Sequence, residues 1–471
     1  MPPWPPSSRT TGPRTTPQSR RRRTEAGVSE LTTNPDRDHL TEMLQLLDGP
    51  QPRLHHLERY YRGTSPKLAY LSAEAKRNLA KFEVLSANLC RVAVLALQER
   101  LRVSGFTGNN AAWPLWLQSD FDQLSATVHR DALLYGQTYV LVWLDKRGRA
   151  RATVESPKDV AIQRDPVTRE IVSAIKRVQT RTSQQIWIYG PEEIQHWTSD
   201  SANSTAYTLQ SRTPNPLGVT PIVAIGLDDD DSVISDLLPV QDAATKMATD
   251  LMAASEAAGR PQRFASGIEA EESPVLDKDG NDTGETEAVN PLPENSNRTW
   301  LAANAQARFG QLSGDRLEGF EAGMRVIMAA AMTVTSLPPS YFGLLQDSVT
   351  SADALRAAES ALVARAEAKQ RAFGTGWETV MRLLIAIDQG IDPYDVSVKV
   401  NWSPADTRSE AQLADASVKL YAAGLLSREA TLRRLGLTDD EIEDELGRIK
   451  RDLVDARDLV LGRYMAGQTD H

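Results

Sequence analysis

Two long amphipathic segments, separated by a polar and turn-rich stretch, constrain the fold of this chain more than any other feature. Ile234–Ala258 and Asp315–Thr333 both repeat apolar residues at helical spacing. As one continuous helix, the first segment would be about 37 Å long, so Pro239 must lie in its first turn or kink it. Residues 259–304 are rich in turn residues, with Asp279-Gly280 as a plausible hairpin tip. The apolar stripes are too long for one subunit to cover, which favours burial between subunits.

The rest of the sequence alternates between helical and strand patterns. Residues 31–101, 351–388 and 407–465 show helical periodicity, and Ser427 and Thr438 are expected to begin two helices of the last region. β-Branched and aromatic runs predict short strands at Gln137–Leu144, Ala150–Glu155, Ile171–Gln179, Gln185–Tyr189, Ile194–Thr198, Pro221–Gly226 and Ser397–Trp402. Together these patterns predict a helix-rich α+β fold.

Charge is distributed unevenly along the chain. Residues 1–28 are rich in Pro, Ser, Thr and Arg, and we expect them to be disordered. Arg21–Arg23 could contact nucleic acid, although a solvated tail or a start codon assigned too early is the favoured interpretation. Six Arg lie in residues 1–23, so the remainder holds 47 of the 53 basic residues against 63 acidic ones, a formal charge of −16. A body this acidic is not a conventional surface for binding duplex DNA.

Most enzyme and cofactor signatures are missing from the sequence. We find no phosphate-binding loop, dinucleotide fingerprint, nucleophile elbow or zinc-protease motif, and the six His residues lack metal-ligand spacing. The single cysteine, Cys90, excludes an intrachain disulfide and is expected to be a buried structural thiol. No stretch reaches the ~18 apolar residues of a membrane span. The sequence therefore predicts no catalytic, cofactor or metal residues and no membrane association.

Two acidic stretches have compositions that could bind a metal ion. Asp277–Glu285 resembles a calcium loop, but its sixth and twelfth positions hold Asp282 and Ala288 where Gly and Glu are needed. Asp228–Asp231 precedes a helix, where negative charge is favourable, so a structural role is preferred there. A carboxylate-metal nuclease that uses this run with Glu271 or Glu272 remains the alternative from the enzyme class.

A set of short stretches carries a more specific signal, because they occur in a fixed order along residues 40–405. The main ones are LERYYRG (57–63), YGQTYVLVW (135–143), Asp231–Ala243 followed by Ala257–Ala265, TSLPPSYFG (335–343), ADALRAAESA (352–361) and RAFGTGWETVMRLL (371–384). In this order they resemble the portal proteins of long-tailed, siphovirus-type bacteriophages, in the branch common among actinobacterial viruses. Residues 1–28 fall outside the resemblance, and 405–471 match only in being helical.

The resemblance implies a portal fold that assembles into a ring, usually of twelve subunits, at one capsid vertex. Its parts map by position onto a disordered tail (1–28), wing (29–227 and 389–404), first stem helix (228–258), clip (259–304), second stem helix (305–335), tunnel loop (336–350), tunnel-facing helix (351–388) and crown (405–471). The implied function is a non-enzymatic DNA conduit for genome packaging, head–tail joining and ejection. A monomeric capsid-assembly or adaptor protein remains a further alternative.

The same resemblance implies partners and candidate site residues. The partners would be copies of this chain, the terminase motor, head–tail adaptors, major capsid and scaffolding proteins, and double-stranded DNA that passes through the channel without sequence preference. The protein would be part of the virion and be assembled in the host cytoplasm. Candidate residues are Asp277, Asp279, Glu285 and Glu287 for docking at the clip, and Tyr341, Phe342, Gln346, Asp347 and Ser348 for the tunnel loop. In that loop the aromatics would anchor the base and the polar residues would face DNA, unless the loop is only a connector whose aromatics fill a subunit interface.

Overall fold

A computed structural model describes most of the chain. The described residues are 35–64, 87–145, 147–202, 204–226, 231–259, 263–266, 271–276, 282–289, 306, 308–311, 318–343, 352–406 and 410–466. Contacts divide the chain into residues 1–42 and 43–471. Helix α1 (Pro35–Asp48) crosses this division, and the elements considered below belong to the second unit.

The first helices of the second unit agree with the helical pattern of residues 31–101. They are α2 (Gln51–Arg62) and α4 (Leu89–Gln98). Asn88 begins α4, because its side-chain oxygen accepts a hydrogen bond from the Arg91 backbone N–H at 2.9 Å. Cys90 is fully buried in α4, and burial raises the pKa of its thiol to about 12, which is consistent with a structural residue. Helices α5 (Ala112–Gln118) and α6 (Phe121–Tyr135), which were not predicted, follow in the chain.

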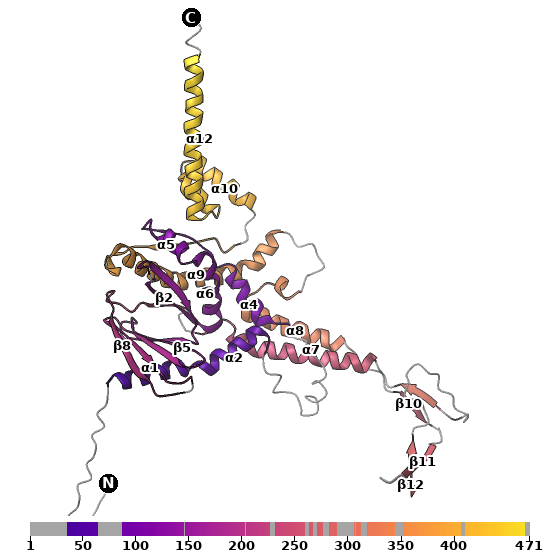
Figure 1. The fold of residues 1–471 in the computed structure, drawn as a ribbon. Coiled ribbons are helices and arrows are strands. Elements are labelled where there is room, and N and C mark those ends of the chain that lie inside the picture. Colours follow the sequence, from indigo (N-terminus) through magenta and orange to yellow (C-terminus); the bar gives the residue numbers. More distant parts are fainter. Residues whose placement is uncertain are drawn as a thin grey trace, which may run out of the picture. The chain divides into compact units, whose positions relative to one another are not determined.

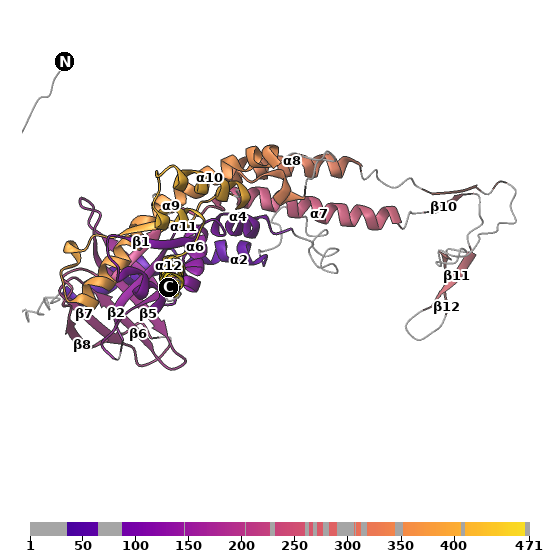
Figure 2. The same cartoon turned by 90° about the horizontal axis from the view of Figure 1, so that it is seen from above.

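Two antiparallel sheets form the strand-rich region (Figures 1 and 2). The smaller has the order β3-β2-β9 and the larger the order β4-β5-β6-β7-β8. Their strands are β2 (Gln137–Leu144), β3 (Ala150–Glu155), β4 (Val160–Arg164), β5 (Ile171–Gln179), β6 (Gln184–Tyr189), β7 (Glu193–Thr198), β8 (Thr208–Pro214) and β9 (Ile222–Gly226). The predicted strands are therefore confirmed, and β4 and β8 are additional. A separate pair joins β1 (Val103–Thr107) to β14 (Lys399–Trp402).

The long helix α9 (Ala352–Gln389) packs against all three strands of the smaller sheet. It runs without interruption through Gly374 and Gly376, which the sequence marked as weak points for a helix. A Cβ atom on Gly376 would lie 3.1 Å from the Ala224 carbonyl oxygen and 2.8 Å from Cγ1 of Ile225. Glycine is therefore needed here for close approach to β9, and this gain outweighs its low helix propensity.

The two long amphipathic segments form α7 (Leu238–Gly259) and α8 (Glu318–Thr335), which lie side by side in both views (Figures 1 and 2). Pro239 is the second residue of α7, where its missing N–H is tolerated, and a short 3₁₀ turn (Ser235–Leu237) precedes it. The stretch between them contains more strand than expected. It holds two antiparallel pairs, β10 (Arg263–Ser266) with β13 (Arg308–Gln311) and β11 (Glu271–Leu276) with β12 (Asp282–Val289). Its last strand thus lies beyond residue 304.

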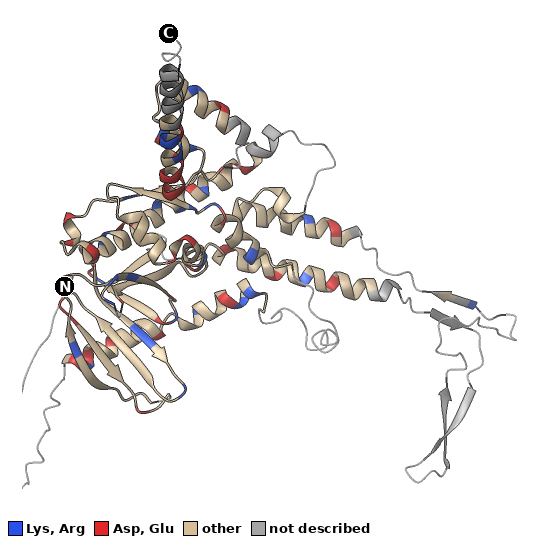
Figure 3. Cartoon of the chain, turned by 45° about the horizontal axis from the view of Figure 1, so that its top comes forward, with Lys and Arg blue, Asp and Glu red and all other residues tan. Residues whose placement is uncertain are grey.

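The C-terminal helices are α10 (Glu410–Ala422), α11 (Arg428–Arg434) and α12 (Asp439–Ala466). Ser427 caps α11 as predicted, since its hydroxyl accepts from the Ala430 N–H at 3.1 Å. Thr438 precedes α12, and its backbone N–H donates to Glu441 at 2.9 Å, as in one half of a capping box. Figure 3 shows acidic residues gathered where α12 begins, and Asp439, Asp440 and Glu441 form that turn.

A buried histidine joins α6, α9 and β14 in the core. The Nε2 atom of His129 accepts a hydrogen bond from Nε1 of Trp377 at 2.8 Å, and its ring stacks on Phe373 with centroids 5.7 Å apart. Trp402 contacts the same ring. Complete burial lowers the pKa of His129 to about 3, so the ring stays neutral in the folded protein.

We therefore predict that His129 makes the folded state less stable as the pH falls below about 6.5. The unfolded chain takes up a proton there and the folded one does not, so the free energy of unfolding should lose about 1.4 kcal/mol per pH unit from this group. This loss continues until the folded pKa of about 3 is reached. Urea unfolding at pH 6.5 and 5 should show a shallower pH dependence for His129→Gln than for the wild type. The exposed His55→Gln is the control, and an unchanged slope in His129→Gln would contradict the assignment.

Candidate functional site

The connection between α8 and α9 begins with an abrupt end to α8. Ser336 adopts a positive φ of 58°, and Leu337 is buried behind it. Pro338 is extended, and Pro339 begins a 3₁₀ turn, η2 (Pro339–Phe342). Proline cannot donate a backbone hydrogen bond and biases the preceding residue away from the helical region, so the two prolines stop the helix here.

Helix α9 holds this end of α8 in place through one arginine. Nη1 of Arg365 donates to the backbone oxygens of Val334 at 3.1 Å and Thr335 at 2.7 Å. The last carbonyl groups of a helix lack partners within the helix and carry partial negative charge, so a buried cation stabilises them. Burial lowers the pKa of Arg365, and nearby Asp236 opposes this shift. The start of the connection is therefore fixed by α9.

A second arginine holds the 3₁₀ turn. Nη1 of Arg100 donates to the Tyr341 hydroxyl and to the Ala96 carbonyl oxygen, each at 3.0 Å. Its guanidinium carbon lies 5.9 Å from the centre of the Tyr341 ring, and Nη2 lies 3.6 Å from Oε2 of Glu359. The Arg100 side chain is only 8% exposed, so these interactions are screened little by water. Tyr341 and Phe342 are half-buried and pack against the main core.

Only two of the five predicted loop residues lie in the described part of the chain. Tyr341 and Phe342 lie at the base of the connection, on the 3₁₀ turn held by Arg100. Gln346, Asp347 and Ser348 lie outside the described residues. The sequence predicts no role for Arg365, and Arg100 appears only within the stretch 88–106, which also resembles the portal family, without a predicted role. Arg100 reaches a partner 241 residues away, and no local pattern signals such a contact.

The candidate docking residues belong to the strand pair β11–β12. Asp277 and Asp279 lie outside the described residues, in the segment that joins the two strands. Glu285 and Glu287 lie on β12, where the structure describes the backbone alone. The hairpin predicted around Asp279-Gly280 is consistent with the pairing of these two strands.

The α7–α8 pair that carries these strands combines tight packing with exposed apolar residues. The two helices pack together, and the end of the Met247 side chain lies over Gly323, 2.7 Å from the position of an added Cβ atom. On the outside, Val326 is 70% exposed and Met252 is 47% exposed. Each helix of the pair therefore leaves one large apolar side chain exposed to solvent in the single chain.

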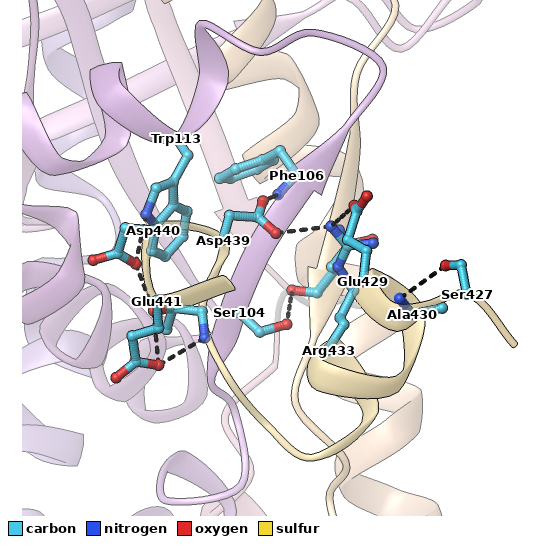
Figure 4. Close-up of polar contacts among 12 residues, drawn as sticks. Ser104, Phe106, Trp113, Ser427, Glu429, Ala430, Arg433, Asp439, Asp440 and Glu441 are labelled. Atoms are coloured by element: carbon cyan, nitrogen blue, oxygen red, sulfur yellow. Dashed lines mark hydrogen bonds and ion pairs between the residues drawn. The ribbon is translucent and has the colours of Figure 1, made fainter. Parts of the chain in front are cut away.

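A third group of contacts attaches the start of α12 to β1, α5 and α11 (Figure 4). Oδ2 of Asp439 accepts from the Phe106 backbone N–H at 2.8 Å, and its Oδ1 accepts from Nη2 of Arg433 at 2.9 Å. Oδ1 of Asp440 accepts from Nε1 of Trp113 at 2.9 Å. Partial burial raises the pKa of Asp440, but hydrogen bonds from Thr438 and Trp113 outweigh this effect and leave its pKa below the ordinary value.

The acidic run considered as a metal site has a structural role at its described end. Asp231 pairs with Arg53, and its Oδ1 accepts from the Ser235 hydroxyl at 2.7 Å. Residues 228–230 lie outside the described part, and Glu271 and Glu272 lie on β11 with only their backbone described. Among the described residues, no group of three or more His, Cys, Asp and Glu could hold a metal ion. None of the described helices is both long and apolar enough to cross a membrane.

We predict that Gly105→Ala loosens α12. Its new Cβ would lie 2.1 Å from Oδ2 of Asp439, so that carboxylate would have to leave Phe106 and Arg433. Losing these charge-assisted bonds should speed amide exchange in the first turns of α12 by about tenfold or more. Hydrogen exchange read by mass spectrometry measures this, with Gly319→Ala on α8 as the control, since no atom lies within 4 Å of its Cβ position and it is not part of α12. Equal exchange rates for α12 in Gly105→Ala and the wild type would show that the Asp439 contacts do not hold this helix.

Comparison with known proteins gives a consistent result. Residues 51–457 match the family described as "Phage portal protein, SPP1 Gp6-like". The portal protein of Mycobacterium phage L5 is 27% identical over 385 residues, which are 75% of this chain and 76% of the relative. The portal protein of Mycobacterium phage D29 shows the same identity and coverage over 384 residues. Among solved structures, the neck of a native gene transfer agent particle, computed with C12 symmetry, matches 78% of this chain and 95% of its own, with 14% identity and a TM-score of 0.42.

Proposed function

Since this chain belongs to the SPP1 Gp6-like family of phage portal proteins, we propose that it forms a ring through which double-stranded DNA enters and leaves the capsid. The observation that carries the proposal is the α7–α8 pair. Its helices pack together at Gly323, yet leave Met252 and Val326 exposed, so neighbouring copies around a ring would cover them. Twelve copies are the expected number.

We infer the roles of the other parts from their positions. The α7–α8 pair would be the stem, and the strand pairs β10–β13 and β11–β12 the clip. The clip would dock the terminase motor and later the head–tail adaptors. Residues 336–350 would be the tunnel loop, α9 the tunnel-facing helix, and α10–α12 the crown. The two sheets and β14 would form the wing, in contact with major capsid and scaffolding proteins. The protein would then be part of the virion, after assembly in the host cytoplasm.

Charge supports a sliding contact with DNA. Residues 24–471 carry a formal charge of −16, so a channel lined by part of this charge would repel phosphate. DNA would then pass without being held, whereas a basic lumen would bind it. Movement of DNA needs work, and we propose that the motor supplies it while the ring catalyses nothing.

The assembly state tests this function most directly. Twelve chains of 51.8 kDa should form particles of about 0.6 MDa. Mass photometry of the purified protein should show this species. A population of monomers alone, across micromolar concentrations, would instead support an adaptor or assembly protein and refute the ring.

A charge reversal tests whether the tunnel loop faces DNA. Asp347→Lys would place one attractive charge per subunit beside passing phosphates, so we expect intact rings but slower packaging or shorter packaged genomes. The effect should be largest at low salt, where the attraction is screened least. The matched control is Asp200→Lys, which changes an exposed acidic residue at the end of β7. Wild-type packaging by Asp347→Lys at low salt would show that this loop lies away from the DNA.

A further inference from the structure

A large cavity lies beside the smaller sheet, away from the loop, clip and crown contacts described above. Its volume is about 1430 Å³. One wall is a stripe of α9 that carries Arg371, Thr375, Thr379 and Arg382. The others come from β9, from the turn between β4 and β5, and from the 3₁₀ turn η3 (Pro393–Asp395) with the residues that lead into β14.

The charge of this cavity is opposite to that of the whole chain. Its lining contains five basic side chains and one acidic side chain, Glu170. Two of the basic groups are partly neutralised by Glu378, since Nζ of Lys399 lies 2.8 Å and Nη2 of Arg382 lies 3.7 Å from its Oε2 atom. Arg169 and Arg371 are exposed, and within the described residues neither side chain forms an ion pair. The cavity therefore retains positive charge that the chain does not neutralise.

Arg169 occupies a backbone conformation that costs energy for any residue except glycine. Its φ is +64°, in the left-handed region. Asp165 holds the turn rigid, because its Oδ1 accepts the backbone N–H groups of Val167 at 2.7 Å and Thr168 at 2.8 Å. Nη1 of Arg164 donates to the Arg169 carbonyl oxygen at 3.2 Å. The turn thus fixes the backbone of Arg169 at a position where glycine would be more stable, which points to a use for its charged side chain.

Exposed apolar side chains beside the basic groups indicate which kind of anion the cavity takes. Val172 on β5 is 40% exposed and Tyr394 in η3 is 75% exposed, and both line the cavity, whereas Ile222 and Val223 of β9 are buried beneath it. The phosphate backbone of duplex DNA offers no apolar group to these side chains. A peptide that combines carboxylates with aliphatic side chains would match both the basic and the apolar groups.

We propose that this cavity is a docking site for an acidic segment of a partner protein that also carries aliphatic residues. Arg169 and Arg371 bind the carboxylates of the segment, and Val172 and Tyr394 contact its aliphatic side chains. One wall of the site belongs to α9, the proposed tunnel-facing helix, so binding is measured with peptides and separately with duplex DNA.

Fluorescence anisotropy of the assembled full-length protein tests the proposal with defined probes. The probe is a short labelled peptide of alternating Glu and Val, and the comparison probe is the matched Gln–Val peptide. Arg169→Gly removes the guanidinium while relieving the strained backbone, so it should fold at least as well as the wild type. Arg371→Gln removes the charge from an exposed position on α9, and Arg91→Gln, exposed on α4, is the control.

We expect the Glu–Val peptide to bind the wild type and Arg91→Gln alike, and the Gln–Val peptide to bind much more weakly. Arg169→Gly and Arg371→Gln should each weaken binding of the Glu–Val peptide by about tenfold. No binding of this peptide, equal binding of both peptides, or unchanged affinity in both variants would overturn the proposal. Binding of a short duplex DNA that the same two substitutions abolish, without peptide binding, would also overturn it in favour of a nucleic-acid site.

Discussion

The close passage of α9 over β9 is the contact on which much of the rest depends. Gly376 permits it, because a Cβ atom there would collide with the Ile225 side chain and crowd the Ala224 carbonyl oxygen of the strand. The same helix places Trp377 against His129, Arg365 against the end of α8 and Arg371 beside the basic cavity. One helix thus fixes the core, the base of the α8–α9 connection and a wall of the cavity. A shift of α9 along its axis would alter all three together.

Two arginines with little or partial exposure hold the start of the α8–α9 connection in place. Arg365 satisfies carbonyl groups that the end of α8 leaves open, and Arg100 combines a hydrogen bond with a cation–π contact on Tyr341. Arg365 lies on α9 and Arg100 in the turn after α4, so the start of the connection is held by the elements that form the core. Because the connection leaves from a fixed point, the segment that follows is free to differ in sequence without disturbing α8.

Periodicity in the sequence predicted those helices and strands that need an apolar neighbour but no particular partner residue. The strands β2, β3 and β5 agree with their predicted bounds because alternating and β-branched residues need only some neighbouring strand. The apolar stripes predicted helices α7 and α8. The N-cap role of Ser427 was predicted because its hydroxyl accepts a hydrogen bond from a residue only three positions away. Strand β8 was missed, since its residues TLQSRTP are mostly exposed and carry no apolar alternation. The contacts of Arg100, Arg365 and Asp439 join residues distant in sequence, and such pairs leave no periodic signal. The family resemblance located the α8–α9 connection, but not the arginines that hold it.

Helix α12 has the geometry of a lever arm. It contains 28 residues, so it is about 42 Å long, while the contacts that attach it to β1 and α5 involve only its first turn. A rotation of about 10° at Asp439 and Asp440 would therefore move its far end by about 7 Å. Small rearrangements at β1, which pairs with β14 next to α9, would be magnified along this helix. A label at the distal end of α12 would therefore move several times farther than the residues of β1 and α5 whose shift causes the rotation.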